Sequence, residues 1–373
     1  MKNKIINAKI FRAKVTNKTN WLFLKLENEI GIVGWGEATL QGKEKQVFEI
    51  SEQIFDLILN KNYSSPYDLK KYLPFKNLSQ ASLSSAIMQC LWDLQGKLEQ
   101  KSIGTIFGKK HNQIKTYANF NRSTIDRSLK GIQTRVKTVL NNGFELIKFA
   151  PFDEVLLGMT SKEIRMAMQP GLERINIIKE NASSEIKLMI DCHWRFNYET
   201  TIDLIKEIED LNLYWLECPI PETIDLLLDI KKIRLIDNSK GIKLAGLEKK
   251  ILAEDFESYV EAGVYDFMMP DIKYAGGPDE LITIEKLFNK FNVQFSPHNP
   301  SGPIAHAHTL QICSATNEPA LMEYQYKETN YFESLLEKPN PEILNGYSTI
   351  PEHINGLGVA INELELKKLN NTT

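Results

Sequence analysis

Acidic side chains follow three successive apolar runs in the middle of the chain. Asp191 ends LMID, Glu217 ends YWLE and Glu248 ends LAGLE. If these runs are neighbouring parallel strands, which lie ~4.8 Å apart, the three carboxylates converge on one point. Like charges in a partly buried site repel one another unless a cation neutralises them. Because oxygen ligands without cysteine favour Mg²⁺, with Mn²⁺ as a possible substitute, we predict a divalent metal site here.

A general base and its partner are predicted beside that metal. Asp271 ends the run FMMPD, and His298 ends the next run, FSPH. An aspartate on an adjacent strand can bond one imidazole nitrogen, which fixes the tautomer and leaves the other nitrogen as a base near neutral pH. His193 lies two residues after Asp191, and in extended backbone such side chains point the same way. We therefore expect His193 to face the same cavity.

Further charged residues end the remaining runs. Lys148 lies in LIKFAPFD, where its ammonium needs an anion; it can neutralise a substrate carboxylate or contribute to proton transfer. Asn121 and Arg122 follow the first of these runs, and Glu323 follows the last. We expect Arg122 and Arg195 to bind distal hydroxyls or a second carboxylate, so aldaric acids remain possible substrates.

These residues need strands whose carboxyl ends meet at one edge. From residue 114 onwards, eight short apolar runs alternate with amphipathic helical segments, which is typical of parallel βαβ units. Eight strands over roughly 200 residues suit a closed β/α barrel, which places its chemistry on the loops after its strands. An open doubly wound sheet is the alternative, but its usual glycine-rich phosphate loop is missing after the first run. The runs are 116–120, 145–149, 187–190, 213–216, 242–245, 265–269, 293–295 and 320–322.

The first part of the chain predicts a separate α+β unit. Residues 5–15, 21–27 and 30–35 read as an antiparallel meander, and 45–59 and 78–98 have helical spacing. We expect a capping domain at 1–113, a barrel at 114–333, and a polar segment at 334–373 that packs back on the cap. If the cap closes over the barrel mouth, Trp21 and the residues near Gly42 are candidate specificity contacts.

Composition and net charge exclude several classes of protein. The 373 residues carry 45 basic and 48 acidic side chains, a net charge of −3, with 42% hydrophobic residues. This is close to the average soluble mixture, which excludes a mainly disordered chain and argues against a nucleic-acid binder. No apolar run approaches the ~20 residues that cross a bilayer, and the start shows no signal peptide, so we expect a cytoplasmic protein without a membrane partner. Four scattered cysteines are expected to be free thiols: Cys90, Cys192, Cys218 and Cys313.

Taken together, these motifs resemble the enolase superfamily, in its mandelate racemase-like branch. The matching segments occur in family order over nearly the whole chain: GWGEA, SAIMQCLWDLQGK, LMIDCHWRF, YWLECPIPE, LAGLE, MMPDIKYAGG, SPHNPSGP and LMEYQ. The resemblance implies a (β/α)7β barrel that binds Mg²⁺, with an α+β cap completed by the C-terminal segment. It also implies a homo-oligomer and removal of the proton α to a carboxylate, giving a metal-stabilised enediolate.

Within that branch the pattern is most similar to acid-sugar dehydratases of the galactonate type. The resemblance implies that His298 takes the α-proton and that His193 protonates the departing β-hydroxyl. Glu323 resembles the residue that bonds the carboxylate of the intermediate. The expected substrate is an aldonate or aldarate, and the expected product is a 2-keto-3-deoxy acid.

The chain departs from the family pattern at two positions. Ala150 stands where the racemase-like motif Lys-x-Lys has its second lysine, which disfavours racemisation because that reaction needs a base on each face. Leu247 separates Gly246 from Glu248, where the family pattern is Gly-Glu. An epimerase or lactone cycloisomerase on the same scaffold is the alternative, and a non-catalytic ligand-binding relative is the third hypothesis.

Overall fold

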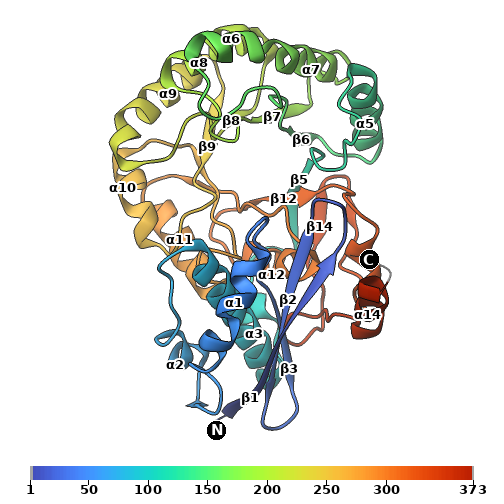
Figure 1. The fold of residues 1–373 in the computed structure, drawn as a ribbon. Coiled ribbons are helices and arrows are strands. Elements are labelled where there is room, and N and C mark those ends of the chain that lie inside the picture. Colours follow the sequence, from blue (N-terminus) through green and yellow to red (C-terminus); the bar gives the residue numbers. More distant parts are fainter. Residues whose placement is uncertain (1–2, 372–373) are drawn as a thin grey trace.

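The computed structural model describes residues 3–371, which form two sheets with helices around them (Figure 1). The first sheet is antiparallel, in the order β3-β2-β1-β4. The strand predicted at 30–35 begins later, because Asn28 Oδ1 accepts the backbone N–H groups of Ile30 and Ile32 and so closes a turn. The strands are β1 (Asn3–Lys14), β2 (Asn20–Asn28), β3 (Val33–Glu37) and β4 (Asn62–Tyr63).

Helices cover one face of this sheet, and one of them approaches the strands very closely. A Cβ atom added at Gly34 would lie 2.2 Å from the backbone oxygen of Cys90, and one at Gly36 equally close to that of Ala86. Only glycine permits this contact between β3 and α3. The helices are α1 (Glu44–Phe55), α2 (Pro66–Lys70), α3 (Leu78–Glu99) and α4 (Ile103–Ile106).

The second sheet holds eight parallel strands, β5 to β12, in sequence order. They overlap the eight predicted runs, and β12 pairs with β5. Between β11 and β12 the contact is a bond from Ser296 Oγ to the Leu321 carbonyl, at 2.7 Å, rather than a strand ladder. The strands are β5 (Gln113–Asn119), β6 (Leu146–Phe149), β7 (Lys187–Asp191), β8 (Trp215–Glu217), β9 (Lys243–Gly246), β10 (Phe267–Met268), β11 (Gln294–Phe295) and β12 (Leu321–Gln325).

Helices between the strands form an arc around this sheet in Figure 1. Inside the sheet, a compact apolar cluster takes side chains from most of the strands and forms a floor below the strand ends. Its members are Tyr117, Leu146, Met189, Trp215, Ala245, Phe267, Met269 and Leu321. The helices are α5 (Leu129–Asn141), α6 (Ser161–Ala167), α7 (Gln169–Glu180), α8 (Tyr198–Ile208), α9 (Leu227–Ser239), α10 (Glu254–Ala262), α11 (Pro278–Lys290) and α12 (Pro303–Cys313), with 3₁₀ turns η1 (Glu209–Leu211) and η2 (Ile224–Leu226).

The C-terminal segment contacts both sheets. Its strand β14 pairs antiparallel with β5, and its last helix lies against β1. Lys25 Nζ, on the neighbouring strand β2, is 2.5 Å from Glu363 Oε1 of that helix. The segment contains α13 (Tyr331–Ser334), β13 (Ile343–Leu344), β14 (Tyr347–Thr349) and α14 (Glu363–Asn371); residues 372 and 373 of the predicted segment lie outside the described part.

Two predictions about the whole chain are tested by this fold. All four cysteines are buried and unpaired, as expected. Across residues 3–371, every helix is too short or too polar to traverse a bilayer.

Candidate active site

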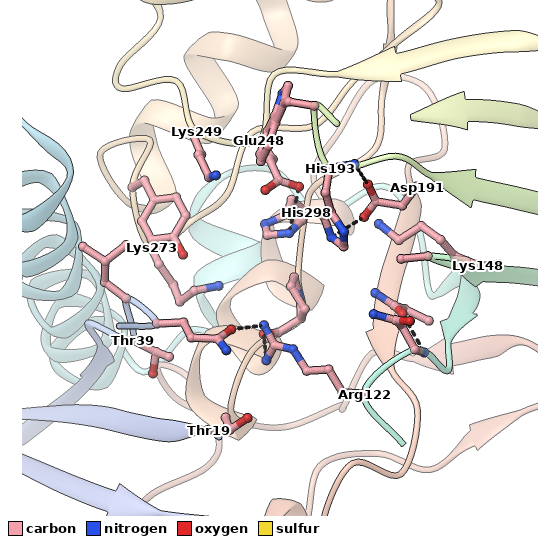
Figure 2. Close-up of a pocket in the computed structure, with 18 of the residues that line it drawn as sticks. Thr19, Thr39, Arg122, Lys148, Asp191, His193, Glu248, Lys249, Lys273 and His298 are labelled. Carbon is pink, nitrogen blue, oxygen red and sulfur yellow. Dashed lines mark hydrogen bonds and ion pairs between the residues drawn. The ribbon is translucent and has the colours of Figure 1, made fainter. Parts of the chain in front are cut away.

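A cavity of about 290 Å³ lies between the strand ends of the second sheet and the loops of the first (Figure 2). Most of the predicted site residues line it or lie directly behind its wall. The residues that line it from the second sheet and its loops are Asn119, Asn121, Arg122, Lys148, Ala150, Asp191, His193, Trp194, Glu248, Lys249, Lys273, Tyr274, His298 and Pro300; those from the cap are Thr19, Asn20, Thr39, Leu40 and Gln41.

The backbone is left-handed at three adjacent strand ends. His193 and Trp194 after β7, Cys218 after β8 and Leu247 after β9 have φ angles of 50°, 57°, 46° and 71°. Such conformations cost about 1–3 kcal/mol each for non-glycine residues and persist where surrounding contacts impose them. Here the Trp194 N–H donates to the Cys218 carbonyl at 2.6 Å, which ties neighbouring loops together. Backbone strain is therefore present at the acidic ends of three adjacent strands.

His193 pairs with Asp191. The backbone N–H of His193 donates to Asp191 Oδ1 at 2.9 Å, and its ring Nε2 lies 3.0 Å from Oδ2. The negative charge of Asp191 outweighs burial and raises the pKa of His193. Burial favours the neutral form of Asp191, but His193 and Lys148 outweigh it and lower the pKa of this carboxyl. The argument from extended backbone was wrong, because His193 is left-handed; the ring reaches the cavity by turning back over Asp191.

His298 lies between two carboxylates. Its Nδ1 is 2.7 Å from Asp271 Oδ2, and its Nε2 is 3.1 Å from Glu248 Oε2. Asp271 is fully buried, which favours its neutral form, but Lys273 and His298 outweigh that effect and lower its pKa. The carboxylate thus stays ionised and holds the His298 ring by Nδ1, with Nε2 turned to the side of the cavity where Glu248 lies.

Lys148 neutralises two buried carboxylates at the base of the cavity. Its Nζ lies 2.7 Å from Glu217 Oε1 and 2.8 Å from Glu323 Oε1. Burial opposes the charged form of Lys148, yet these two acids raise its pKa well above the usual value. Burial raises the pKa of Glu217 well above normal, against Lys148 and with the help of Asp191. Lys148 therefore offsets only part of the repulsion that Glu217 experiences from Asp191, Glu323 and Glu248.

Glu323 is held in place from behind the cavity. Its Oε1 accepts a bond from Asn119 Nδ2, and its Oε2 accepts one from the Asn299 backbone N–H, both at 2.8 Å. Burial raises the pKa of Glu323, but Lys148 and His298 outweigh burial and lower it. Glu323 is therefore an ionised carboxylate that orients Lys148, and it does not line the cavity itself.

The predicted metal ligands fit Mg²⁺ in donor type and charge. Asp191, Glu217 and Glu248 offer only oxygen, and their mutual repulsion contributes to the raised pKa of Glu217. The positions of these oxygens differ from a metal cage: across residues 3–371, no three His, Cys, Asp or Glu side chains are gathered as ligands of one ion. Each acid instead contacts a cationic or imidazole group of the chain: His193, Lys148 or His298.

The residues predicted to bind substrate divide into two groups. Arg122 and Asn121 line the cavity; Arg122 Nη2 donates to Gln41 Oε1 of the cap at 2.9 Å. Arg195 lies outside it, because its guanidinium bonds the carbonyl of Phe152 and so anchors the loop after β6. Trp21 is buried against the Cα of Gly302 behind the cavity wall. The cap reaches the cavity instead through the residues just before Trp21 and through 39–41.

Sequence reasoning missed Lys273 and Trp215. Lys273 Nζ lies 2.8 Å from Asp271 Oδ2, and Trp215 Nε1 donates to Glu217 Oε2 at 3.1 Å. Trp215 stands two residues before Glu217 in β8, so the alternation of side chains along a strand could have identified it. Lys273 lies in the turn after β10, where that rule gives no signal.

Two models of protein families match the chain. A family model described as "Mandelate racemase / muconate lactonizing enzyme, N-terminal domain" matches residues 8–108. A second, described as "Enolase C-terminal domain-like", matches residues 131–365, which is more than half of the chain. The chain belongs to the enolase superfamily. Members of this superfamily are Mg²⁺-binding enzymes that act on small carboxylates.

Solved structures of the enolase superfamily share the fold along the whole chain. A candidate dehydratase from Salmonella enterica serovar Typhimurium has a TM-score of 0.88 at 19% identity, covering 98% of both chains. One from Mesorhizobium loti has the same TM-score at 21% identity, again covering 98% of both chains. A mandelate racemase/muconate lactonizing enzyme from Jannaschia sp. CCS1 has a TM-score of 0.86 at 19% identity, covering 98% of this chain and 97% of that one. At these identities the likeness concerns the fold alone.

Proposed function

We propose that this chain is a Mg²⁺-dependent dehydratase of an acid sugar, an aldonate or aldarate. It removes the proton α to the carboxylate and eliminates the β-hydroxyl to give a 2-keto-3-deoxy acid. The observation that carries the proposal is a cavity lined by two histidines, each paired with its own aspartate, while Ala150 replaces a second lysine. One base and one acid suffice for dehydration, whereas racemisation requires a base on each face of the α-carbon.

The substrate carboxylate is proposed to lie beside Lys148, whose ammonium adds positive charge where charge develops. Mg²⁺, held by Asp191, Glu217 and Glu248, would supply Lewis-acid stabilisation of that carboxylate in its doubly charged form. An α-proton beside a carboxylate is otherwise too weakly acidic for an imidazole to remove.

Two proton transfers complete the reaction. His298 accepts the α-proton at Nε2, since Nδ1 is held by Asp271. The electron pair of the broken C–H bond forms the C=C bond as the β C–O bond breaks. His193, kept protonated by Asp191, donates a proton to the leaving hydroxyl, which departs as water. The enol that remains tautomerises to the 2-keto acid.

The architecture belongs to the same proposal. We interpret β5 to β12 as a (β/α)7β barrel, with a cap at 1–113, a barrel at 114–333 and a C-terminal segment from 334. A homo-oligomer is also proposed, and size-exclusion chromatography with light scattering tests it.

The test is detection of keto acid with semicarbazide over a panel of aldonic and aldaric acids, using Mg²⁺-loaded protein. We expect at least one acid to give a semicarbazone and His298→Asn protein to give none. An epimerase or cycloisomerase would instead exchange the α-proton in D₂O or isomerise a ring without releasing water. Folded, metal-loaded protein that leaves every acid unchanged would count against the proposal and favour a ligand-binding relative.

A further inference from the structure

We infer that Lys273 contacts the substrate and selects a second carboxylate at the end remote from Lys148, so that the substrate is an aldarate rather than an aldonate. This inference rests on the proposed function and narrows it to dicarboxylic acid sugars.

The first observation is that one of the three N–H groups of the buried Lys273 ammonium has no acceptor among the described residues. The side chain of Lys273 is 2% exposed, and its Nζ donates to Asp271 Oδ2 at 2.8 Å and to Ser301 Oγ. An ammonium has three N–H donors. Among the described residues the third N–H has no acceptor, and the ring of Tyr274, whose centroid lies 5.3 Å away, offers only a weak cation–π contact. A buried donor without a partner is costly, so this position calls for a ligand acceptor.

The second observation is where that donor points. Lys273 lines the cavity, and Figure 2 shows its amine directed into it. Lys148 also lines the cavity, and its ammonium pairs with Glu217 and Glu323. In Figure 2, Lys148 and Lys273 lie on opposite sides of His298. A ligand whose reacting carboxylate lies beside Lys148 therefore presents its other end to Lys273.

The third observation is the charge around that end. The only acids among the described lining residues are Asp191 and Glu248, which contact the two histidines. The other charged side chains of the lining, apart from the two histidines, are the cations Arg122, Lys148, Lys249 and Lys273, and the cap contributes the neutral Thr39 and Gln41. Arg122 donates to Gln41 Oε1 and to the Pro300 carbonyl, and its one ion pair, with Glu328, is long at 3.5 Å; Lys249 Nζ lies 3.6 Å from the ring centroid of Trp194. An oxyanion complements this wall better than the neutral hydroxymethyl group that ends an aldonate.

The experiment compares matched pairs of acids that differ only at the last carbon: gluconate with glucarate, galactonate with galactarate, and mannonate with mannarate. kcat/KM is measured for Mg²⁺-loaded wild-type, Lys273→Met and Lys137→Met proteins. Lys137→Met removes the same charge from an exposed position on α5. We expect wild type to prefer one diacid by about 10- to 100-fold, the range for a hydrogen bond to a charged group. We expect Lys273→Met to bring this ratio close to one and Lys137→Met to preserve it.

The ratio separates contact from positioning. If Lys273 only orients Asp271, both acids lose activity together and the ratio is unchanged, which overturns the inference. Equal turnover of both acids by wild type also overturns it, while leaving dehydration standing. If no acid is dehydrated, the proposed function fails, and calorimetric binding of the same pairs then decides the inference: tighter diacid binding that Lys273→Met abolishes supports it, and equal or absent binding refutes it.

Discussion

Oδ2 of Asp271 lies 2.7 Å from Nδ1 of His298. Because Asp271 is buried and ionised, it holds the proton on Nδ1 and leaves Nε2 as the basic nitrogen. The same oxygen accepts a bond from Lys273, so a base and a substrate-contacting cation are anchored at one point. Changes at this carboxylate should therefore alter proton abstraction by His298.

Asp271→Asn tests the role of that carboxylate. An amide has nearly the same shape, but it no longer fixes the tautomer of His298 or stabilises its protonated form. We expect kcat for keto-acid formation to fall by about 10²- to 10⁴-fold, the usual contribution of a positioned base. Thermal unfolding and circular dichroism serve as the folding control. A variant within threefold of wild-type kcat would show that Asp271 does not position or activate the base.

His193→Asn should separate the two proton transfers. The proposed acid is lost while His298 remains, so abstraction proceeds without elimination. We expect keto-acid formation to fall at least about 10²-fold. We expect exchange of the substrate α-proton in D₂O, followed by NMR, to continue at a measurable rate. Loss of exchange together with dehydration would show that His193 does not act solely as the acid.

Mg²⁺ should stabilise the folded chain by mass action. Repulsion from Asp191 and Glu248 contributes to the raised pKa of Glu217, so a cation bound by these carboxylates would relieve a repulsion that is present only in the folded state. At a free concentration of 100 times Kd, the free energy of unfolding should rise by about 2.7 kcal/mol. Denaturant titrations with and without Mg²⁺, at matched ionic strength, measure this. Asp191→Asn should reduce the increase in unfolding free energy. A wild-type unfolding midpoint that does not change with Mg²⁺ would contradict the proposed metal site.

Strand positions and strand-end acids could be predicted from the sequence because both follow from local pattern. Short apolar runs predict the strands, and the parallel register pairs Asp191 with Glu217 and Glu217 with Ala245, which brings the ends of β7, β8 and β9 together. Spacing alone could not reveal the direction of each side chain beyond its strand. At His193 the chain leaves the extended conformation, so the periodic rule applies no further.

Cap contacts were harder to predict for a related reason. The indole of Trp21 packs behind the wall, while the two residues before it, Thr19 and Asn20, reach the opening. The long side chain of Arg195 bonds a neighbouring loop, and Lys273 reaches the cavity from beside Asp271. Long side chains of this kind are placed by tertiary contacts that lie far away in sequence.

Backbone strain at Leu247 gives an unusual order of stabilities. Leu247 is buried with φ +71°, where glycine is favoured over any L-residue by about 1–2 kcal/mol. Removing its side chain should cost about 2–5 kcal/mol in both Leu247→Ala and Leu247→Gly. The glycine variant should nevertheless be about 1 kcal/mol more stable than the alanine variant, as measured by urea unfolding. The matched pair at Leu244, a buried position in β9 without positive φ, should show the opposite order.

Asp237 on α9 should make stability depend on pH. Neither of its buried carboxyl oxygens has a hydrogen-bond partner among the described residues. Burial, with a smaller effect of Asp266, raises the pKa of Asp237 from 3.8 to about 8. Between these values the folded state keeps a proton that the unfolded state has lost, so rising pH favours unfolding; below pH 4 and above pH 8 this contribution is flat.

At about 1.4 kcal/mol per pKa unit, the free energy of unfolding should fall by about 5 kcal/mol from pH 4 to pH 8 through this group alone. Asp237→Asn cannot ionise, so its stability should exceed that of wild type near pH 8 and lose most of the advantage near pH 4. Urea midpoints at half-unit pH steps measure the difference between the two proteins. Asp225→Asn, an exposed acid in η2, is the control and should leave the slope unchanged. Parallel pH curves for wild type and Asp237→Asn would show that Asp237 does not titrate in this range.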